Sequence, residues 1–230
     1  MQLGFRRFIK IFLSTFFMQT SWSFYARQGM GFMSSLITGT DRNQKNKILK
    51  EHKGYFNTHP YMVSYIIGAT IRAYDEGNAS TEETKRFITI AQTSFASSGD
   101  LLFWETIRPS LLLIAVILGM KFGIIGPLTF IIAYNILHLY HRIKGISDGY
   151  AMGWNVIYLL KSKRFTSVQR VFEIIGALFT GLLFTLICLK INYLALVPLT
   201  IFFIFLLIKR YSAVMIILAL LLLLLIVVLV

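Results

Sequence analysis

Residues 100–108, with the sequence DLLFWETIR, place charged and aromatic side chains at the start of a long apolar stretch. Asp100, Trp104 and Arg108 are spaced four residues apart, so in an α-helix they share one face. A carboxylate accepts hydrogen bonds from sugar hydroxyls, and an aromatic ring covers the apolar C–H surface of a sugar. Because charged groups at membrane depth usually face a wet cavity or a protein interior, we predict that this face binds substrate.

The same residues have a simpler interpretation. Glu105 lies three residues before Arg108 and could form an ion pair with it on the helix. Trp104 is typical of the aromatic residues that gather where a membrane meets water. In this alternative, the stretch is an interfacial ion pair beside an aromatic anchor, and it binds no ligand.

A second candidate is the sequence NTHP at residues 57–60. Pro60 disfavours helical backbone at His59, so the chain is expected to be extended or to turn there. His59 could shuttle a proton or hydrogen-bond a substrate hydroxyl, and Asn57 could bind substrate beside it. In the alternative, Asn57 or Thr58 accepts from backbone N–H groups and caps the start of a helix.

Asn135 lies in the middle of an otherwise apolar segment, so its amide needs a hydrogen-bonding partner. Because that partner is either a second subunit or substrate, Asn135 is a third candidate for substrate binding. His138 and His141 are three residues apart, but no third ligand follows at metal-site spacing, and no metal site is predicted. A cytoplasmic helix end rich in His and Arg accounts for them. Cys188 is the sole cysteine, which excludes an intramolecular disulfide.

The composition is that of a helical membrane protein. Of the 230 residues, 56% are hydrophobic and 14% are charged, whereas soluble domains have roughly 45–50% and about 25%. The net charge of +13 comes from Lys and Arg in short segments beside apolar runs, as in cytoplasmic loops that contact anionic lipid. No basic helix carries interleaved base-stacking aromatics, so nucleic acid is not a predicted partner. No Ser/His/Asp arrangement or phosphate-binding Gly-rich loop is present, so no cofactor and no catalysis by the chain alone are predicted.

Residues 1–54 are predicted to form an interfacial amphipathic helix followed by a basic connector. Apolar residues near the N-terminus recur at three- and four-residue spacing, while Arg6, Arg7 and Lys10 lie off that face and would point toward lipid headgroups. In the alternative, this helix packs on the protein's own domain. The apolar face consists of Phe5, Phe8, Ile9, Phe12, Leu13, Phe16 and Phe17.

Residues 55–150 are predicted to form a core of re-entrant or broken helices. The apolar run at 61–71 is shorter than the about 20 residues that span a bilayer, so it is either re-entrant or buried in protein. Residues 111–120 and 124–140 are interpreted as two short apolar helices interrupted near Gly123, with a Gly-Pro pair inside the second. Such discontinuous helices line the binding sites of transporters.

Residues 151–230 are predicted to form a cytoplasmic connector and transmembrane anchor helices at 171–189, 193–208 and 212–230. Cations are enriched in the segment 141–170, which places it in the cytoplasm. The N-terminus is then cytoplasmic and the C-terminus extracytoplasmic. The predicted class is an all-α integral membrane protein with about three full C-terminal transmembrane helices.

Several blocks of the sequence occur in the order found in a known family. They read FFMQTSWSFYARQGMGFMSSL, YFNTHPYMVSYIIGATI, SSGDLLFWETIRPSLL and GIIGPLTFIIAYNILHLYHRIKGISDGYAMG, and ALVPLTIFFIFLLIKRYSAVMIILAL follows near the C-terminus. Together they resemble the IID subunit of the mannose/fructose/sorbose family of the bacterial phosphotransferase system. The resemblance covers most of the chain, and the third block contains Asp100, Trp104 and Arg108.

This resemblance implies a subunit of the bacterial inner membrane that pairs with a IIC subunit to form the pathway for a hexose. It implies a trimer of IIC–IID pairs and cytoplasmic IIA and IIB components whose histidines carry the phosphoryl group. The IID chain would carry no phosphohistidine, so its role in the enzyme complex is to bind and move sugar.

Two departures from the family pattern favour an alternative function. ITIAQTSFASSGD replaces a glycine-rich stretch before Gly99, and only residues 190–192 connect two of the predicted spans. In the alternative, the protein is a diverged IID-like chain that does not transport and serves as a regulatory or scaffold partner.

Overall fold

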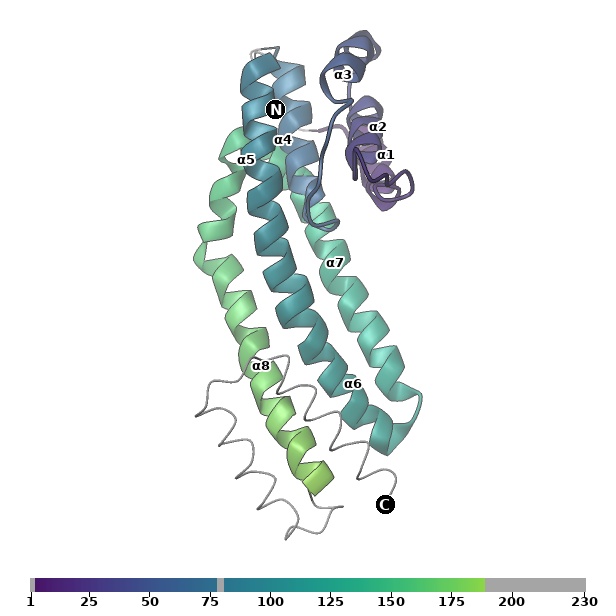
Figure 1. Ribbon diagram of the computed structural model, residues 1–230, viewed down its shortest axis with the longest axis vertical. Coiled ribbons are helices and arrows are strands. Elements are labelled where there is room, and N and C mark those ends of the chain that lie inside the picture. Colours follow the sequence, from purple (N-terminus) through teal and green to yellow (C-terminus); the bar gives the residue numbers. More distant parts are fainter. Residues whose placement is uncertain (1–2, 78–80, 189–230) are drawn as a thin grey trace. The chain divides into compact units, whose positions relative to one another are not determined.

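The computed structural model describes residues 3–77 and 81–188, and every regular element in these ranges is helical (Figure 1). The predicted all-α class is therefore confirmed for the part of the chain that is described. The chain divides into two compact units, Met1–Phe179 and Thr180–Val230, and all helices from α1 to α7 lie in the first. The elements are α1 (Phe5–Phe16), α2 (Gly29–Gly39), η1 (Arg42–Gln44), α3 (Lys45–Glu51), α4 (Val63–Glu76), α5 (Thr81–Gly99), η2 (Asp100–Ile107), α6 (Arg108–Phe122), α7 (Ile125–Met152), η3 (Gly153–Lys161) and α8 (Lys163–Cys188).

Three consecutive elements, α5, η2 and α6, form one continuous helix that reaches Phe122. The chain then turns at Gly123 into α7, which packs along α6 (Figure 1). Gly123 has a φ of +59°, a conformation that glycine adopts without the steric cost of a Cβ. Pro127 lies in the first turn of α7, where its missing N–H breaks no helical hydrogen bond. We predicted two short, broken helices here, but the structure has two long helices that form a hairpin.

Helix α4 is the centre of the first unit, and most of its side chains are buried. It packs against α7 through glycines: a Cβ on Gly149 would stand 2.3 Å from the carbonyl oxygen of Tyr65. From the other side of this contact, a Cβ on Gly68 of α4 would stand 2.5 Å from the carbonyl oxygen of Ile146 on α7. Glycine at these positions lets the two backbones approach. Of the two alternatives for the run at 61–71, the structure favours burial in protein.

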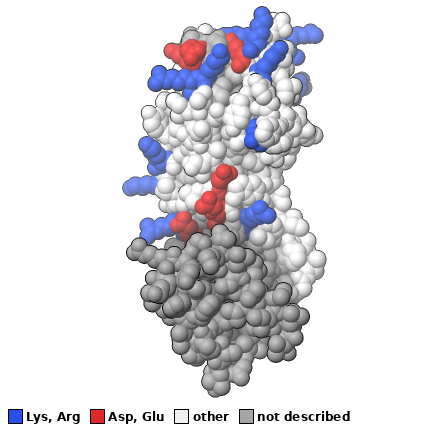
Figure 2. Space-filling view, in the orientation of Figure 1, with Lys and Arg blue, Asp and Glu red and all other residues white. Residues whose placement is uncertain are grey.

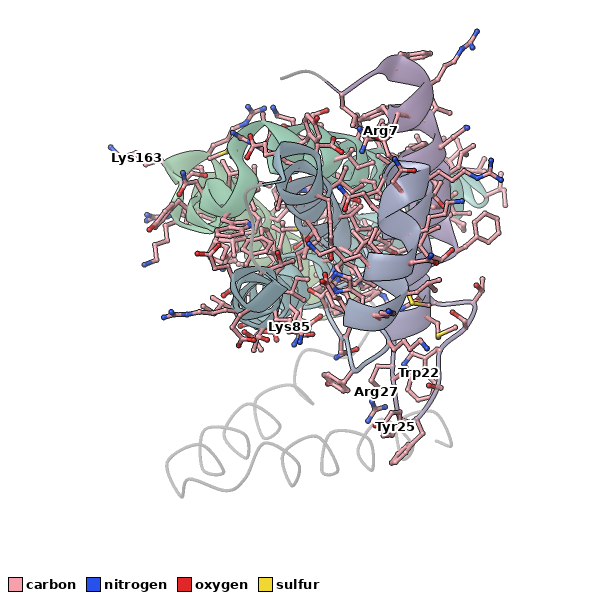
Figure 3. The ribbon with its side chains drawn as sticks, turned by 90° about the horizontal axis from the view of Figure 1, so that it is seen from above. Arg7, Trp22, Tyr25, Arg27, Lys85 and Lys163 are labelled. Carbon is pink, nitrogen blue, oxygen red and sulfur yellow. The ribbon has the colours of Figure 1, made fainter. Side chains whose placement is uncertain are left out.

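Helix α1 packs on α2, α4 and α7, and its buried positions are Ile11 and Thr15. Arg7 points toward the rest of the chain (Figure 3), where two of its guanidinium nitrogens each lie 2.7 Å from an oxygen of Asp75. The prediction that Arg7 faces lipid headgroups was therefore wrong. On the side of α1 that carries Arg7, the alternative is correct, because this side packs on the protein's own helices. The opposite side still exposes the apolar side chains of Phe5, Leu13, Phe16 and Phe17.

Two helices in the described part are long and apolar enough to cross a membrane, Glu82–Phe122 and Lys163–Leu183. In the face shown in Figure 2, many basic side chains, with a few acidic ones among them, lie at the end of the first unit that carries α3 and the start of α5. Within the predicted span at 171–189, α8 exposes apolar side chains such as Ile174 and Leu178. The predicted spans at 193–208 and 212–230 lie outside the described residues.

Candidate functional site

The stretch 100–107 forms a π-helix rather than an α-helix. The hydroxyl of Thr106 donates to the carbonyl oxygen of Leu101, five residues earlier, at 2.7 Å. Pro109 follows directly and has no N–H with which to continue the α-helical pattern, so the sequence favours a wider turn at this place. Wide turns inside α-helices are frequent at functional sites.

The predicted face exists in the structure and is centred on Trp104. The indole of Trp104 lies near the carboxylate of Asp100, and the guanidinium carbon of Arg108 lies 5.4 Å from the centroid of the indole. All three side chains are exposed on this chain. Within the described residues, Glu105 forms no ion pair with Arg108, so the simple interfacial pair is not what the structure shows.

His59 lies under this face and is almost completely buried, with 1% of its surface exposed. Its ring is stacked on Phe103, with centroids 5.0 Å apart, and lies 5.2 Å from the ring of Trp104. The backbone N–H of Tyr61 donates to Nδ1 of His59 at 3.3 Å, which in a neutral imidazole places the proton on Nε2. Among the described residues Nε2 has no hydrogen-bonding partner. The site therefore contains a buried N–H donor for which the described part of the chain supplies no acceptor.

Tyr61 joins this group to α7. Its ring is stacked on His138 at a centroid distance of 4.7 Å, and the guanidinium carbon of Arg142 lies 5.3 Å from the ring centroid of Tyr61. Arg142 is 6% exposed and donates from Nη1 to the carbonyl oxygen of Thr15 at 2.6 Å. Its Nε has no partner within the part of the chain that the structure describes. Nδ1 of His138 and the hydroxyl of Tyr134 likewise lack partners among the described residues. Buried polar atoms are nearly always paired, so four such atoms around the ring of Tyr61 indicate an incomplete site.

The prediction that His138 and His141 lie at the end of a helix was wrong. Helix α7 continues to Met152, and both histidines are buried inside the first unit. Nδ1 of His141 lies 3.1 Å from the hydroxyl of Tyr65, so this residue belongs to the contact between α7 and α4. Within the described residues no group of three or more His, Cys, Asp or Glu side chains could hold a metal ion.

Asn135 and Asn57 lie at the margins of the group. The amide nitrogen of Asn135 donates to the carbonyl oxygen of Ile131 at 2.7 Å, and its oxygen lies 2.9 Å from Nε2 of His138. Both ends of this amide are thus paired on α7 itself, so the partner that we inferred from the sequence is supplied by the same helix. The side chain of Asn57 is exposed, and its backbone N–H donates to Gln92 on α5 at 3.1 Å. Their part in substrate binding stays a prediction.

Tyr61 and Arg142 connect the two predicted segments, and neither residue was among those predicted from the sequence. Tyr61 follows directly after His59-Pro60, and Arg142 lies four residues after His138, on the same face of one helix. That spacing was a usable signal, because a polar face on a long apolar helix requires a buried partner.

Comparison with known proteins identifies the family of the chain. Residues 2–193 match the model of the mannose/fructose/sorbose family IID component of the phosphotransferase system. The mannose-specific EIID component of Escherichia coli K12 is 27% identical over 157 residues, which cover 64% of this chain and 56% of that protein. The fructose permease IID component of Bacillus subtilis is 26% identical over 187 residues, covering 77% and 68%. The matched part thus spans little more than half of the E. coli relative.

Solved structures support the same fold. One, described only as a membrane protein, superposes with a TM-score of 0.73 at 20% identity and covers 96% of this chain and 95% of its own. A chain from the cryo-EM complex of the mannose transporter ManYZ with microcin E492 gives a TM-score of 0.62 at 21% identity, covering 96% and 94%. At these identities the likeness concerns the fold alone, which is that of a membrane protein. The family itself is shown by the match over residues 2–193. The chain belongs to the mannose/fructose/sorbose family of the phosphotransferase system as a IID component of the bacterial inner membrane.

Proposed function

We propose that this chain is the IID half of a sugar-translocating permease and that it forms the sugar pathway together with a IIC subunit. The observation that carries the proposal is the face formed by Asp100, Trp104 and Arg108, which is exposed on a helix long and apolar enough to cross a membrane. Exposed charges at membrane depth are costly unless a second protein surface or a hydrated cavity covers them.

The chemistry of the face fits a hexose. The carboxylate of Asp100 and the indole of Trp104 lie near each other, so they could bind a hydroxyl and the C–H surface of one sugar ring. Beneath them, Nε2–H of His59, which has no partner among the described residues, supplies a donor for a hydroxyl or for a carbonyl group of the partner. The exposed side of the face is open, so the rest of the site would come from IIC.

In this proposal the cytoplasmic IIA and IIB components supply the phosphoryl group, and the sugar receives it on the cytoplasmic side. The chain assembles as a trimer of IIC–IID pairs, with its N-terminus in the cytoplasm and its C-terminus outside. Its membership in the family supports this arrangement, and so do the basic side chains at one end of the first unit (Figure 2). Anionic lipids are expected to contact these cations.

The test is sugar uptake by cells that express the chain with its cognate IIA, IIB and IIC proteins. We expect Asp100→Asn to abolish phosphorylation-linked uptake while membrane insertion and copurification with IIC persist. Glu105→Gln is the matched control, because it removes an exposed carboxylate five residues away on the same π-helix. Normal uptake by Asp100→Asn would exclude Asp100 from the site. No uptake by the unaltered chain, although it copurifies with IIC, would favour the diverged scaffold protein instead.

A further inference from the structure

A cavity of about 260 Å³ has a lining that includes none of Asp100, Trp104 and Arg108. It is open on one side and is lined by the C-terminal half of α7, the end of η3 and the first turns of α8, together with Tyr65 of α4 and Leu102 of η2. The proposed sugar site uses none of its charged side chains. Those charged residues are Lys144, Asp148 and Arg164.

The charges in this cavity leave an excess positive group. Nζ of Lys144 lies 2.7 Å from a carboxylate oxygen of Asp148, so these two charges are paired. Arg164 donates from Nη2 to the hydroxyl of Tyr140 at 2.9 Å, and it forms no ion pair with a carboxylate in the described residues. A guanidinium has five N–H donors in a planar fork that matches two oxygens of a phosphate or carboxylate. The cavity therefore offers an uncompensated arginine to an anion.

Much of the remaining lining is apolar. It includes Leu102, Leu159, Phe165 and Val168, which offer no hydrogen-bonding group to a small hydrated anion. From here α8 continues as a helix that exposes apolar residues, among them Val171, Ile174 and Leu178. A ligand with an anionic head and an apolar tail would place its head against Arg164 and its tail along α8.

We propose that this cavity, between α7 and the start of α8, binds the phosphate of an anionic phospholipid. The chain lies in a bacterial inner membrane, so such lipids surround it, and basic pockets between helices near the cytoplasmic surface are suited to their headgroups. Lys161, Lys163 and Arg170 lie near the cavity in sequence and raise the local concentration of anionic lipid. This proposal is independent of sugar transport, because it uses residues that lie outside the proposed sugar site.

The test uses the full-length chain, purified in detergent, delipidated and titrated with phosphatidylglycerol or with phosphatidylcholine of the same acyl chains. Native mass spectrometry measures the bound lipid. We expect phosphatidylglycerol to bind more tightly, and Arg164→Gln to weaken it about tenfold, since a charge-assisted hydrogen-bonded contact is lost. Lys163→Gln is the matched control: Lys163 is exposed, does not line the cavity and points outward in Figure 3. Lys163→Gln removes the same charge one residue away, and we expect it to change the affinity for phosphatidylglycerol by less than about threefold.

A second variant tests the cavity without changing its charge. Val168→Phe fills the apolar wall and is expected to reduce phosphatidylglycerol binding while the thermal unfolding temperature in detergent stays near that of the unaltered chain. Equal binding of the two lipids, or equal losses in Arg164→Gln and Lys163→Gln, would overturn the proposal. Displacement of the lipid by equimolar glycerol 3-phosphate would overturn the assignment to a lipid and would place a soluble phosphate ester in the cavity.

Discussion

Gly99 and His59 approach so closely that a Cβ built on Gly99 would stand 2.5 Å from the Cβ of His59. The same added atom would also lie 2.8 Å from Cγ of Met62. The chain therefore reaches the loop that carries His59 only because residue 99 has no side chain. This contact fixes the imidazole beneath Trp104 and joins the two segments from which the candidate site is built.

Replacing Gly99 by Ala is expected to displace His59 and to destabilise the first unit. The contact involves the Cβ of His59, close to the backbone, so it cannot be relieved by a small side-chain movement. Overpacking of this kind typically costs about 1–3 kcal/mol. The free energy of unfolding in detergent, measured by chemical denaturation, checks this expectation. Gly181→Ala is the control, because an added Cβ there meets nothing within 4 Å and helical Gly→Ala changes are neutral or stabilising.

Asp75 attaches α1 to the core, because it accepts from Arg7 at 2.7 Å and from the hydroxyl of Tyr150 at 2.9 Å. The side chains of Arg7 and Asp75 are only 28% and 11% exposed. Asp75→Asn leaves a largely buried guanidinium without its counter-charge, which is expected to cost about 1–3 kcal/mol. Limited proteolysis of α1 should become faster in this variant.

The matched control for Asp75 is its neighbour Glu76. Glu76 pairs with Arg72 at 2.7 Å, but both side chains are about one-third exposed, and the pair lies within one helix. Such pairs contribute about 0.3–0.5 kcal/mol. Glu76→Gln should therefore leave proteolysis of α1 nearly unchanged, and equal effects of the two substitutions would contradict the assigned role of Asp75.

His52 makes the stability of the first unit sensitive to pH. Burial lowers the pKa of His52 from 6.5 to about 4, nearby Lys85 adds to this lowering, and Glu51 opposes it. Between pH 6.5 and 4 the unfolded chain binds a proton at His52 that the folded chain does not bind. The free energy of unfolding therefore falls as the pH drops through this window, by about 3 kcal/mol in total, and the contribution is complete above pH 6.5.

Unfolding midpoints measured from pH 7.5 to 4.5 check this expectation. His52→Gln removes the titrating group, so the variant should lose less stability on acidification than the unaltered chain. The difference between the two pH profiles isolates His52 from the other histidines. Parallel profiles would show that its imidazole is not held neutral by burial beside Tyr74.

Trp104→Phe separates the two functions that we assign to the indole. A phenyl ring still places an aromatic face beside His59 and Arg108, but it has no N–H to donate to a substrate hydroxyl or to the neighbouring carboxylate of Asp100. If the indole N–H takes part in sugar binding, uptake should fall severalfold through a higher KM, while thermal stability changes by less than about 1 kcal/mol. An unchanged KM would show that the indole N–H has no part in sugar binding.

Several features could be predicted because they depend on local sequence. The four-residue spacing of Asp100, Trp104 and Arg108 predicted that they share one face, and in the structure all three are exposed, with Arg108 over the ring of Trp104. The π-helix could not be predicted, because one turn of altered hydrogen bonding leaves no periodic signal. The interruption near Gly123 was read as a break within a span, because a Gly in an apolar run does not distinguish a kink from a hairpin turn.

The inward orientation of Arg7 and the burial of His138 and Arg142 could not be predicted from the sequence either. Basic residues and histidines beside apolar runs are typical of a membrane surface or a helix end, and each of these three side chains contacts a residue that is remote in the chain. Arg7 meets Asp75, and Arg142 meets Thr15, at separations of 68 and 127 residues. No local pattern indicates such pairs.

The sequence by itself determined the class, the family and the two segments that carry the candidate site, because hydropathy, charge and motif order are properties of the chain alone. Only the tertiary structure decided that these segments meet, with His59 beneath Trp104 and Tyr61 against His138. The physical reason is that these contacts join residues far apart in the chain. Gly99 and Gly149 allow the close approach to His59 and Tyr65 because they have no side chain, and the spacing of residues in the sequence does not indicate which segment will approach them.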